Sequence, residues 1–130
     1  MLVNTNSEAE LIACGYDFGL TLTPGAVVVL NGPLGAGKTT FVKGIAQALG
    51  ITDPITSPTY TISRLYGEKL CHVDSYRISN EDIGLEDMQS QGYIICIEWA
   101  ENIADYLPDI DYRIDIEYTE FGRQIEIKKY

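Results

Sequence analysis

Apolar residues recur with the period of an α-helix in two segments of the N-terminal half of the chain. The first segment follows Ser7, a plausible N-cap with Glu10 three residues further on, and we expect a helix from there to about Leu20. In the second segment, apolar residues within 41–49 fall at helical spacing, and Gly50 supplies a stop signal. The pattern therefore predicts two amphipathic helices.

Two other segments are short, continuous apolar runs rich in β-branched residues. Residues 26–30 read Ala-Val-Val-Val-Leu, and residues 93–97 read Tyr-Ile-Ile-Cys-Ile. Such runs are typical of strands buried on both faces of a parallel sheet. Together with the predicted helices, they indicate an α/β fold.

Further β-prone segments come in pairs around turn residues. Residues 59–65 and 69–74 predict one hairpin. Residues 111–118 and 123–130 alternate apolar and polar side chains, which predicts a second hairpin exposed on one face. Between the two pairs, residues 80–88 are expected to form a helix.

A glycine-rich loop joins the strand predicted at 26–30 to the helix predicted at 41–49. It matches the pattern G-x-x-x-x-G-K-[ST], in which backbone amides wrap around polyphosphate. The candidate phosphate-binding residues are Gly32, Pro33, Leu34, Gly35, Ala36, Gly37, Lys38, Thr39 and Thr40. Because strand, loop and helix occur together, a nucleotide-phosphate site is favoured over a glycine-rich turn that holds no ligand.

The residue types of this loop indicate a different role for its glycines, its lysine and its threonine. Gly32, Gly35 and Gly37 allow backbone torsions closed to other residues, so that successive N–H groups converge on phosphate oxygens at a positive helix end. Lys38 is expected to reach the β- and γ-phosphates as a point charge. The Thr39 hydroxyl is the expected Mg²⁺ ligand, because Mg²⁺ takes few protein oxygens and completes its shell with phosphates and water.

These elements predict a single domain over residues 1–130, a P-loop NTPase-like, three-layer α/β fold. We expect a mostly parallel central sheet with antiparallel hairpin additions. A chain of 130 residues, 45% hydrophobic and 22% charged, has the usual composition of one globular core. The apolar runs are too short to cross a bilayer, and the N-terminus lacks the features of a signal peptide, which predicts a cytoplasmic location.

The charge balance argues against a chain that grips nucleic acid by itself. The net charge is −10, and only nine residues are Lys or Arg, without a basic run. Neutralising nucleic-acid phosphates requires clustered basic residues. If the function involves RNA, a partner is expected to hold it.

The cysteines predict no separate chemistry. Cys14, Cys71 and Cys96 are odd in number, lack C-x-x-C spacing and lie in apolar surroundings. These features favour small buried hydrophobic residues over a metal or redox site.

Two acids could complete the phosphate site. Glu98 follows the apolar run 94–97, and Asp74 follows the less apolar run 70–73. In open α/β sheets, ligands lie beyond the carboxyl ends of the strands, so both acids are expected to face the nucleotide and its Mg²⁺. The alternative is that either one is a solvated loop acid.

Two further side chains near these acids allow two interpretations each. Trp99 could shield the γ-phosphate or belong to the core. His72 shares a strand face with Asp74, which would suit a metal pair, although a single histidine in an apolar strand is more often structural.

The segment Ser57-Pro-Thr-Tyr-Thr61 lies where nucleotide-sensing switch segments of P-loop proteins are found. Thr59 or Thr61 could meet the γ-phosphate side of the metal. The alternative is a rigid turn followed by strand threonines.

Four motifs in order and spacing resemble the TsaE family. They are Gly-x-Leu-Gly-Ala-Gly-Lys-Thr-Thr-Phe at 32–41, Ser-Pro-Thr-Tyr-Thr at 57–61, His-x-Asp-x-Tyr-Arg at 72–77 and Ile-Glu-Trp at 97–99. This resemblance spans nearly the whole chain. It implies the small ATPase subunit of the bacterial machinery that forms threonylcarbamoyladenosine at position 37 of tRNA, acting with the partners TsaD and TsaB. By this resemblance, the subunit does not transfer the carbamoyl group, and its ATP cycle resets the partner.

The resemblance also implies roles for individual residues. The amides of 32–40 and the Lys38 ammonium would hold the phosphates of ATP. Thr39 and Glu98 would serve Mg²⁺, and Asp74 would order the metal's waters or the attacking water.

On the base side, the resemblance implies that Trp99 lies close to the nucleotide and that Arg123 lies against the base or ribose.

Two residues depart from the family pattern. Pro33 stands where Asp is usual, which removes a charge and one N–H from the loop. Leu11 stands where a Thr is common, on the adenine side.

Two other functions remain possible on the sequence. A small P-loop kinase acting on a metabolite or nucleotide would use the same loop. Such enzymes clamp the transferred group with several arginines, whereas this chain has only four in its whole length, which argues against a kinase. A nucleotide-binding adaptor that does not hydrolyse ATP is the other alternative.

Overall fold

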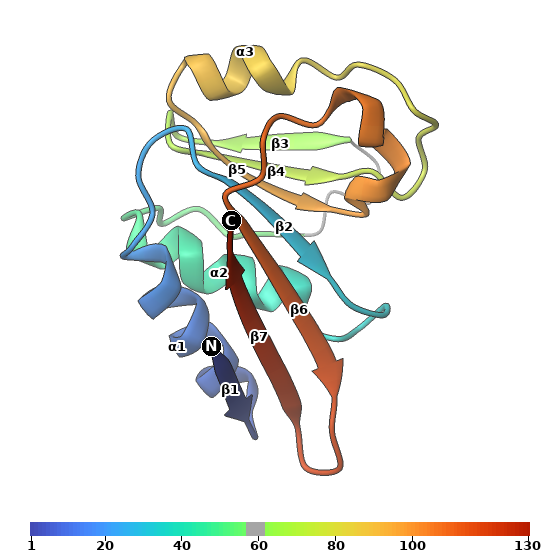
Figure 1. The fold of residues 1–130 in the computed structure, drawn as a ribbon. Coiled ribbons are helices and arrows are strands. Elements are labelled where there is room, and N and C mark those ends of the chain that lie inside the picture. The colour runs from blue at the N-terminus through green and yellow to red at the C-terminus, as the bar shows by residue number, and fades with distance from the viewer. Residues whose placement is uncertain (57–61) are drawn as a thin grey trace.

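The computed structural model describes residues 1–56 and 62–130. Strands are interspersed with helices along the chain, and the glycine-rich loop joins β2 to α2 (Figure 1). The elements are β1 (Leu2–Thr5), α1 (Glu8–Gly19), β2 (Val27–Asn31), α2 (Lys38–Ala48), β3 (Ser63–Tyr66), β4 (Leu70–Asp74), α3 (Leu85–Ser90), β5 (Ile94–Glu98), the 3₁₀ helix η1 (Ala100–Tyr106), β6 (Tyr112–Tyr118) and β7 (Arg123–Lys129).

Within the described residues, seven strands form one sheet in the order β1-β7-β6-β2-β5-β4-β3. The four central strands, β4, β5, β2 and β6, are parallel to one another. The three remaining pairings are antiparallel. Tight turns join β3 to β4 and β6 to β7, and β1 pairs with the outer edge of β7. The sheet is therefore mixed, and the expected parallel arrangement holds for its centre only.

Helices cover both faces of this sheet (Figure 1). Val28 and Leu30 of β2 pack in one apolar cluster with residues of α1 and α2. Val27 and Val29 pack on the opposite face with residues of α3 and η1. Successive β2 side chains are thus buried on alternate faces, which confirms that its apolar run is a central strand and that the domain has three layers.

Several predicted elements are confirmed. The Ser7 hydroxyl caps α1 by accepting a hydrogen bond from the Glu10 amide at 3.1 Å. Both predicted hairpins are present as β3–β4 and β6–β7, although residues 59–61 of the first prediction lie outside the described residues. None of the helices in the described ranges is long and apolar enough to cross a membrane.

The helix predicted at 80–88 begins later than expected. α3 starts at Leu85, after Gly84 in a left-handed conformation. Asn80 instead donates a side-chain hydrogen bond to Asp105, and Asp82 accepts one from the Gly84 amide. Side-chain hydrogen bonds to η1 and to the Gly84 amide thus take the place of the expected helical turn. The sequence patterns also gave no prediction of β1 or η1.

Glycines allow α1 and α2 to touch at their backbones. A methyl group added to Gly15 would lie 2.2 Å from the carbonyl oxygen of Phe41, and one added to Gly44 would lie 2.1 Å from that of Ile12. Such distances are far below van der Waals contact. Phe41 belongs to the first part of α2, so this contact also fixes the helix that begins at the glycine-rich loop.

We predict that Gly15→Ala lowers the free energy of unfolding by about 3 kcal/mol, because the two helices have to separate to admit the methyl group. Urea unfolding followed by circular dichroism measures this loss. Ala13→Ser, on the exposed side of the same helix, is the matched control and should cost about 0.5 kcal/mol or less. Equal stability of the two variants would contradict the close contact.

The buried cysteines lie in the centre of the sheet and behave as small hydrophobic residues. Burial raises the pKa of the Cys71 thiol to about 11. Burial, followed by the nearby Cys71 and Glu98, raises the pKa of Cys96 still further. Cys14 is only partly buried, and burial followed by the charge of Asp17 raises its pKa as well.

We therefore predict that Cys14 is alkylated first in the folded chain at pH 8, because the thiolates of Cys71 and Cys96 are disfavoured there. Peptide mass spectrometry after iodoacetamide treatment measures the order. Equal labelling of all three cysteines in the folded state would contradict this order.

Because the pKa of Cys71 is raised in the folded state, its buried neutral thiol contributes to the free energy of unfolding. We predict that this contribution is fully present below pH 9 and is lost as the pH rises towards 11.

Candidate functional site

The glycine-rich loop leaves β2 at its carboxyl end and leads directly into α2. Gly37 is the N-cap of α2 with φ 110°, and as a glycine it supplies no capping side chain. The first N–H groups of a helix have no acceptor within the helix, so they form an anion-binding end. A Cβ atom at Gly32 would lie 2.4 Å from the Ile116 carbonyl oxygen, which leaves glycine as the residue that fits there.

Lys38 is the first residue of α2, directly after this loop, and is almost fully buried, with 6% of its surface exposed. Its Nζ atom donates a hydrogen bond to the Gly32 carbonyl oxygen at 2.8 Å. The same atom lies 4.0 Å from Glu98 Oε1 and 4.4 Å from the centre of the Trp99 ring. A positive charge is thus held between a carbonyl, a carboxylate and an aromatic face.

The two predicted acids lie side by side at the ends of neighbouring strands. The parallel register of β4 and β5 places Asp74 opposite Glu98. Thr39 Oγ1 donates a long hydrogen bond of 3.4 Å to Glu98 Oε2. Lys38, Thr39, Asp74, Glu98 and Trp99 line one pocket of about 300 Å³.

This pocket offers oxygen donors of the kind that Mg²⁺ prefers. Among the described residues, no group of three or more His, Cys, Asp or Glu could hold a metal ion by itself. A Thr hydroxyl and one or two carboxylates therefore fit a cation that takes its remaining ligands from phosphates and water. Zinc-type coordination takes three or four protein ligands, and the described residues bring no such group together.

His72 has a contact that the sequence patterns did not predict. Its ring is fully buried, and Nε2 lies 2.7 Å from Glu98 Oε2. The His72 nitrogen thus contacts Glu98 and not Asp74, the acid with which one interpretation of the sequence paired it; the metal pair itself stays a prediction. The parallel strand register, which a sequence alone does not reveal, creates this contact.

Trp99 follows Glu98 in an unusual backbone conformation. Its φ of 60° lies in the left-handed region, which bulky residues rarely adopt. The Tyr76 ring packs against it with ring centres 4.9 Å apart. Strained residues persist where surrounding contacts hold them and cluster at functional sites.

Arg123 lies on the other side of the loop, at the start of β7. Its Nε donates to the Ala36 carbonyl oxygen at 2.9 Å, and its guanidinium lies 4.2 Å from the centre of the Tyr118 ring. A second pocket of about 340 Å³ extends from Arg123 over Leu11 and Thr40. The loop thus has a polar pocket on each side.

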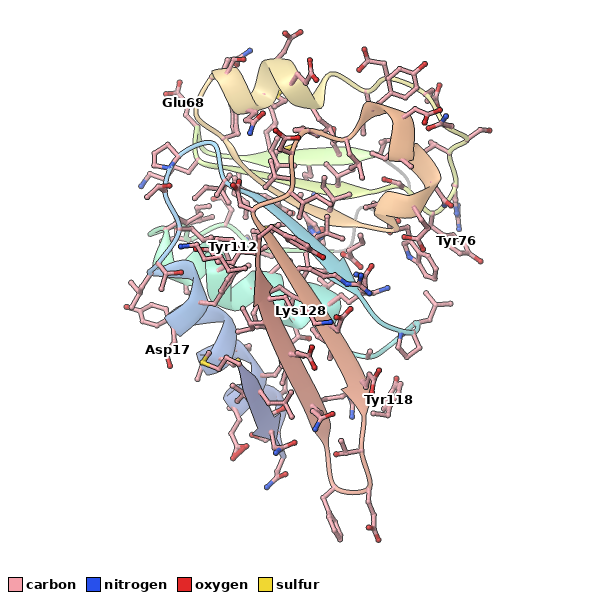
Figure 2. The ribbon with its side chains drawn as sticks, viewed as in Figure 1. Asp17, Glu68, Tyr76, Tyr112, Tyr118 and Lys128 are labelled. Atoms are coloured by element: carbon pink, nitrogen blue, oxygen red, sulfur yellow. The ribbon has the colours of Figure 1, made fainter. Side chains whose placement is uncertain are left out.

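Figure 2 shows Tyr76 and Tyr118 projecting on opposite sides of the loop between β2 and α2. The Tyr118 hydroxyl donates to the Leu34 carbonyl oxygen at 3.2 Å, which ties the β6–β7 hairpin to the tip of the loop. Pro33 accepts a hydrogen bond from the Ala36 amide at 3.1 Å, so this residue takes part in a turn despite lacking an N–H. The predicted switch segment, residues 57–61, lies outside the described residues.

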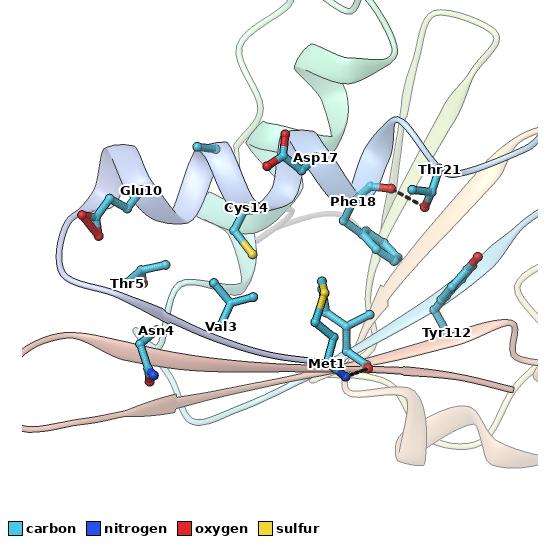
Figure 3. Close-up of a pocket in the computed structure, with 12 residues that line it drawn as sticks. Met1, Val3, Asn4, Thr5, Glu10, Cys14, Asp17, Phe18, Thr21 and Tyr112 are labelled. Carbon is cyan, nitrogen blue, oxygen red and sulfur yellow. Dashed lines mark hydrogen bonds between the residues drawn. The ribbon is translucent and has the colours of Figure 1, made fainter.

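A more spacious pocket of about 620 Å³ lies between α1 and the β1–β7 edge (Figure 3). Its lining is mainly apolar, and several polar atoms around it already have partners. The Thr21 hydroxyl donates to Phe18, and the Met1 ammonium donates to Ile127. Glu10 accepts a hydrogen bond from Asn6. This pocket therefore lacks the converging polar groups of the loop site.

Comparison with known proteins finds similar chains over most of the length of this one. A family model described as "Threonylcarbamoyl adenosine biosynthesis protein TsaE" matches residues 5–125. A protein of Treponema pallidum named tRNA threonylcarbamoyladenosine biosynthesis protein TsaE is 40% identical over 92% of this chain and 93% of its own length. The protein of that name in Bacillus subtilis is 43% identical over 80% of this chain and 75% of its own length.

The fold also matches a solved structure. The crystal structure of YdiB from Bacillus subtilis superimposes with a TM-score of 0.86 and 32% sequence identity. The match covers 99% of this chain and 84% of that one.

Proposed function

This chain belongs to the TsaE family, and on that premise we propose that it is the ATP-binding and ATP-hydrolysing subunit of the system that forms N6-threonylcarbamoyladenosine at position 37 of tRNA. The observation that supports the ATPase role most directly is the meeting of Lys38, Thr39 and Glu98 at the end of the β2–α2 loop. These three side chains supply a cation for phosphates and oxygen ligands for a metal.

In this proposal, the loop amides of 32–40 bind the phosphates of ATP. Lys38 leaves the Gly32 carbonyl and donates to phosphate oxygens instead. Such an exchange is favourable because hydrogen bonds between charged groups are the stronger ones. Arg123 and the pocket beside it receive the base or ribose.

Thr39 and Glu98 hold the Mg²⁺ that accompanies the nucleotide. When bound, Mg²⁺ neutralises the charge that develops on the β- and γ-phosphate oxygens. Asp74, opposite Glu98 in the neighbouring strand, orders either the metal's waters or the attacking water. Trp99 covers the Lys38 side of this pocket and limits the access of bulk water.

The partners in this proposal are TsaD and TsaB, and tRNA is met only through them. The net charge of −10 supports this division, because a strongly acidic surface repels nucleic acid. The cytoplasm, where tRNA is found, is the proposed location. By this proposal, the chain does not transfer the threonylcarbamoyl group itself.

We predict that Lys38→Ala weakens ATP binding by about 10- to 100-fold, which corresponds to the roughly 1.5–3 kcal/mol of a charged hydrogen bond. Isothermal titration calorimetry measures the affinity. Lys43→Ala is the matched control, since Lys43 lies on the same helix and pairs with Glu8 at the surface. Unchanged ATP affinity in the Lys38 variant would place the nucleotide elsewhere.

We further predict that Glu98→Gln and Asp74→Asn each lower ATP turnover by about 100-fold while changing ATP affinity much less. Both substitutions keep the size of the side chain and remove a charge that is needed for hydrolysis. Phosphate release should be measured with and without TsaD and TsaB, with Glu101→Gln as an exposed control. Strong stimulation by the partners supports the proposal. Turnover that needs only a small-molecule acceptor would favour a kinase, and no phosphate release under any condition would favour an adaptor.

A further inference from the structure

His72 is the only histidine of the chain, and it lies in the middle of a strand that is otherwise apolar up to Asp74. Its side chain has no exposed surface. A buried polar ring lowers stability unless its nitrogens are hydrogen-bonded. The contact made by His72 therefore needs an explanation.

The partner of His72 is Glu98, which we have placed at the Mg²⁺ side of the proposed site. In the parallel register of β4 and β5, His72 stands opposite Cys96 and Asp74 stands opposite Glu98. His72 and Glu98 are two positions apart along this register, so their side chains extend from the same face of the sheet. Their atoms meet at 2.7 Å.

Among the described residues, three side chains approach the Glu98 carboxylate, and His72 makes the shortest contact. His72 Nε2 and Thr39 Oγ1 both approach Oε2, at 2.7 and 3.4 Å, whereas Lys38 Nζ lies 4.0 Å from Oε1. The histidine thus holds one carboxylate oxygen against β4 and leaves the other oxygen directed towards the lysine of the phosphate loop.

Stability alone does not account for this arrangement. Replacing a buried polar or charged pair with apolar residues of similar volume is often neutral or stabilising. The second ring nitrogen, Nδ1, is buried without a hydrogen-bond partner among the described residues, which adds to the cost of the pair. A pair that costs stability and adjoins the phosphate loop is better explained by function.

We propose that His72 is a positioning residue: its Nε2–H donates to Glu98 and fixes the carboxylate in the orientation that serves the Mg²⁺ of the bound nucleotide. This inference rests on the proposed ATPase function and deepens it. A hydrogen on Nδ1 would be a buried donor without an acceptor in the described part of the chain, so the geometry assigns the ring hydrogen to Nε2. Groups that orient metal ligands in this way commonly change metal affinity by about 10- to 100-fold when they are removed.

The test compares His72→Gln with His72→Met. The two new side chains have nearly the same length, but Gln retains an N–H where Nε2 lies, and Met has no donor. Binding of a non-hydrolysable ATP analogue is measured by calorimetry with and without Mg²⁺ in the wild type and in both variants. Circular dichroism and thermal unfolding verify that each variant is folded.

We expect the gain in affinity on adding Mg²⁺ to fall about 10-fold in His72→Met and to stay within about threefold of the wild type in His72→Gln. Affinity without Mg²⁺ should be alike in all three proteins, because the loop amides and Lys38 remain. An undiminished Mg²⁺ gain in His72→Met would overturn this inference alone. A wild type that does not bind the analogue at all would instead overturn the proposed function.

Nitrogen-15 NMR of the wild type gives an independent answer that does not depend on either variant folding. A single histidine produces one pair of ring nitrogen signals, so the assignment is unambiguous. We expect the hydrogen on Nε2, and a shift of that signal when Mg²⁺ and the analogue are added together but not with the analogue alone. A hydrogen on Nδ1, or an Nε2 signal indifferent to Mg²⁺, would show that His72 is merely a core residue.

Discussion

The parallel pairing of β4, β5 and β2 determines where the charged groups of this domain lie. In parallel strands all carboxyl ends reach the same edge of the sheet, so residues that follow three different strands meet there. Asp74 and Glu98 stand opposite each other, and β2 delivers the glycine-rich loop beside them. A shift of one residue in either pairing would turn Glu98 to the opposite face, away from both Lys38 and His72.

In the described part of the chain, three ionisable side chains near this edge of the sheet are hardly exposed. His72, Lys38 and Glu98 have 0%, 6% and 4% of their surfaces accessible. A single buried charge would be very unfavourable, but here a cation and a hydrogen-bonding ring share one carboxylate. The three groups therefore depend on one another, and a change at any of them alters the surroundings of the other two.

Features set by neighbouring residues could be predicted from the sequence. The loop motif, the Ser7 cap, the central strands and both hairpins follow from local patterns, and the structure contains them. β1 was missed because four residues carry little periodic signal and pair with a strand at the far end of the chain. The contact between His72 and Glu98 was missed for a similar reason, since only the strand register brings them together. The switch interpretation of Ser57–Thr61 stays a prediction.

The indole of Trp99 also allows the site to be observed by tryptophan fluorescence. Trp99 is the only tryptophan of the chain, and the Lys38 ammonium lies 4.4 Å from the centre of its ring. Tryptophan emission responds to nearby charges, so any movement of Lys38 changes the fluorescence of this one residue. The protein therefore contains a natural reporter at the loop, and changes at the site can be followed in real time without attaching a dye.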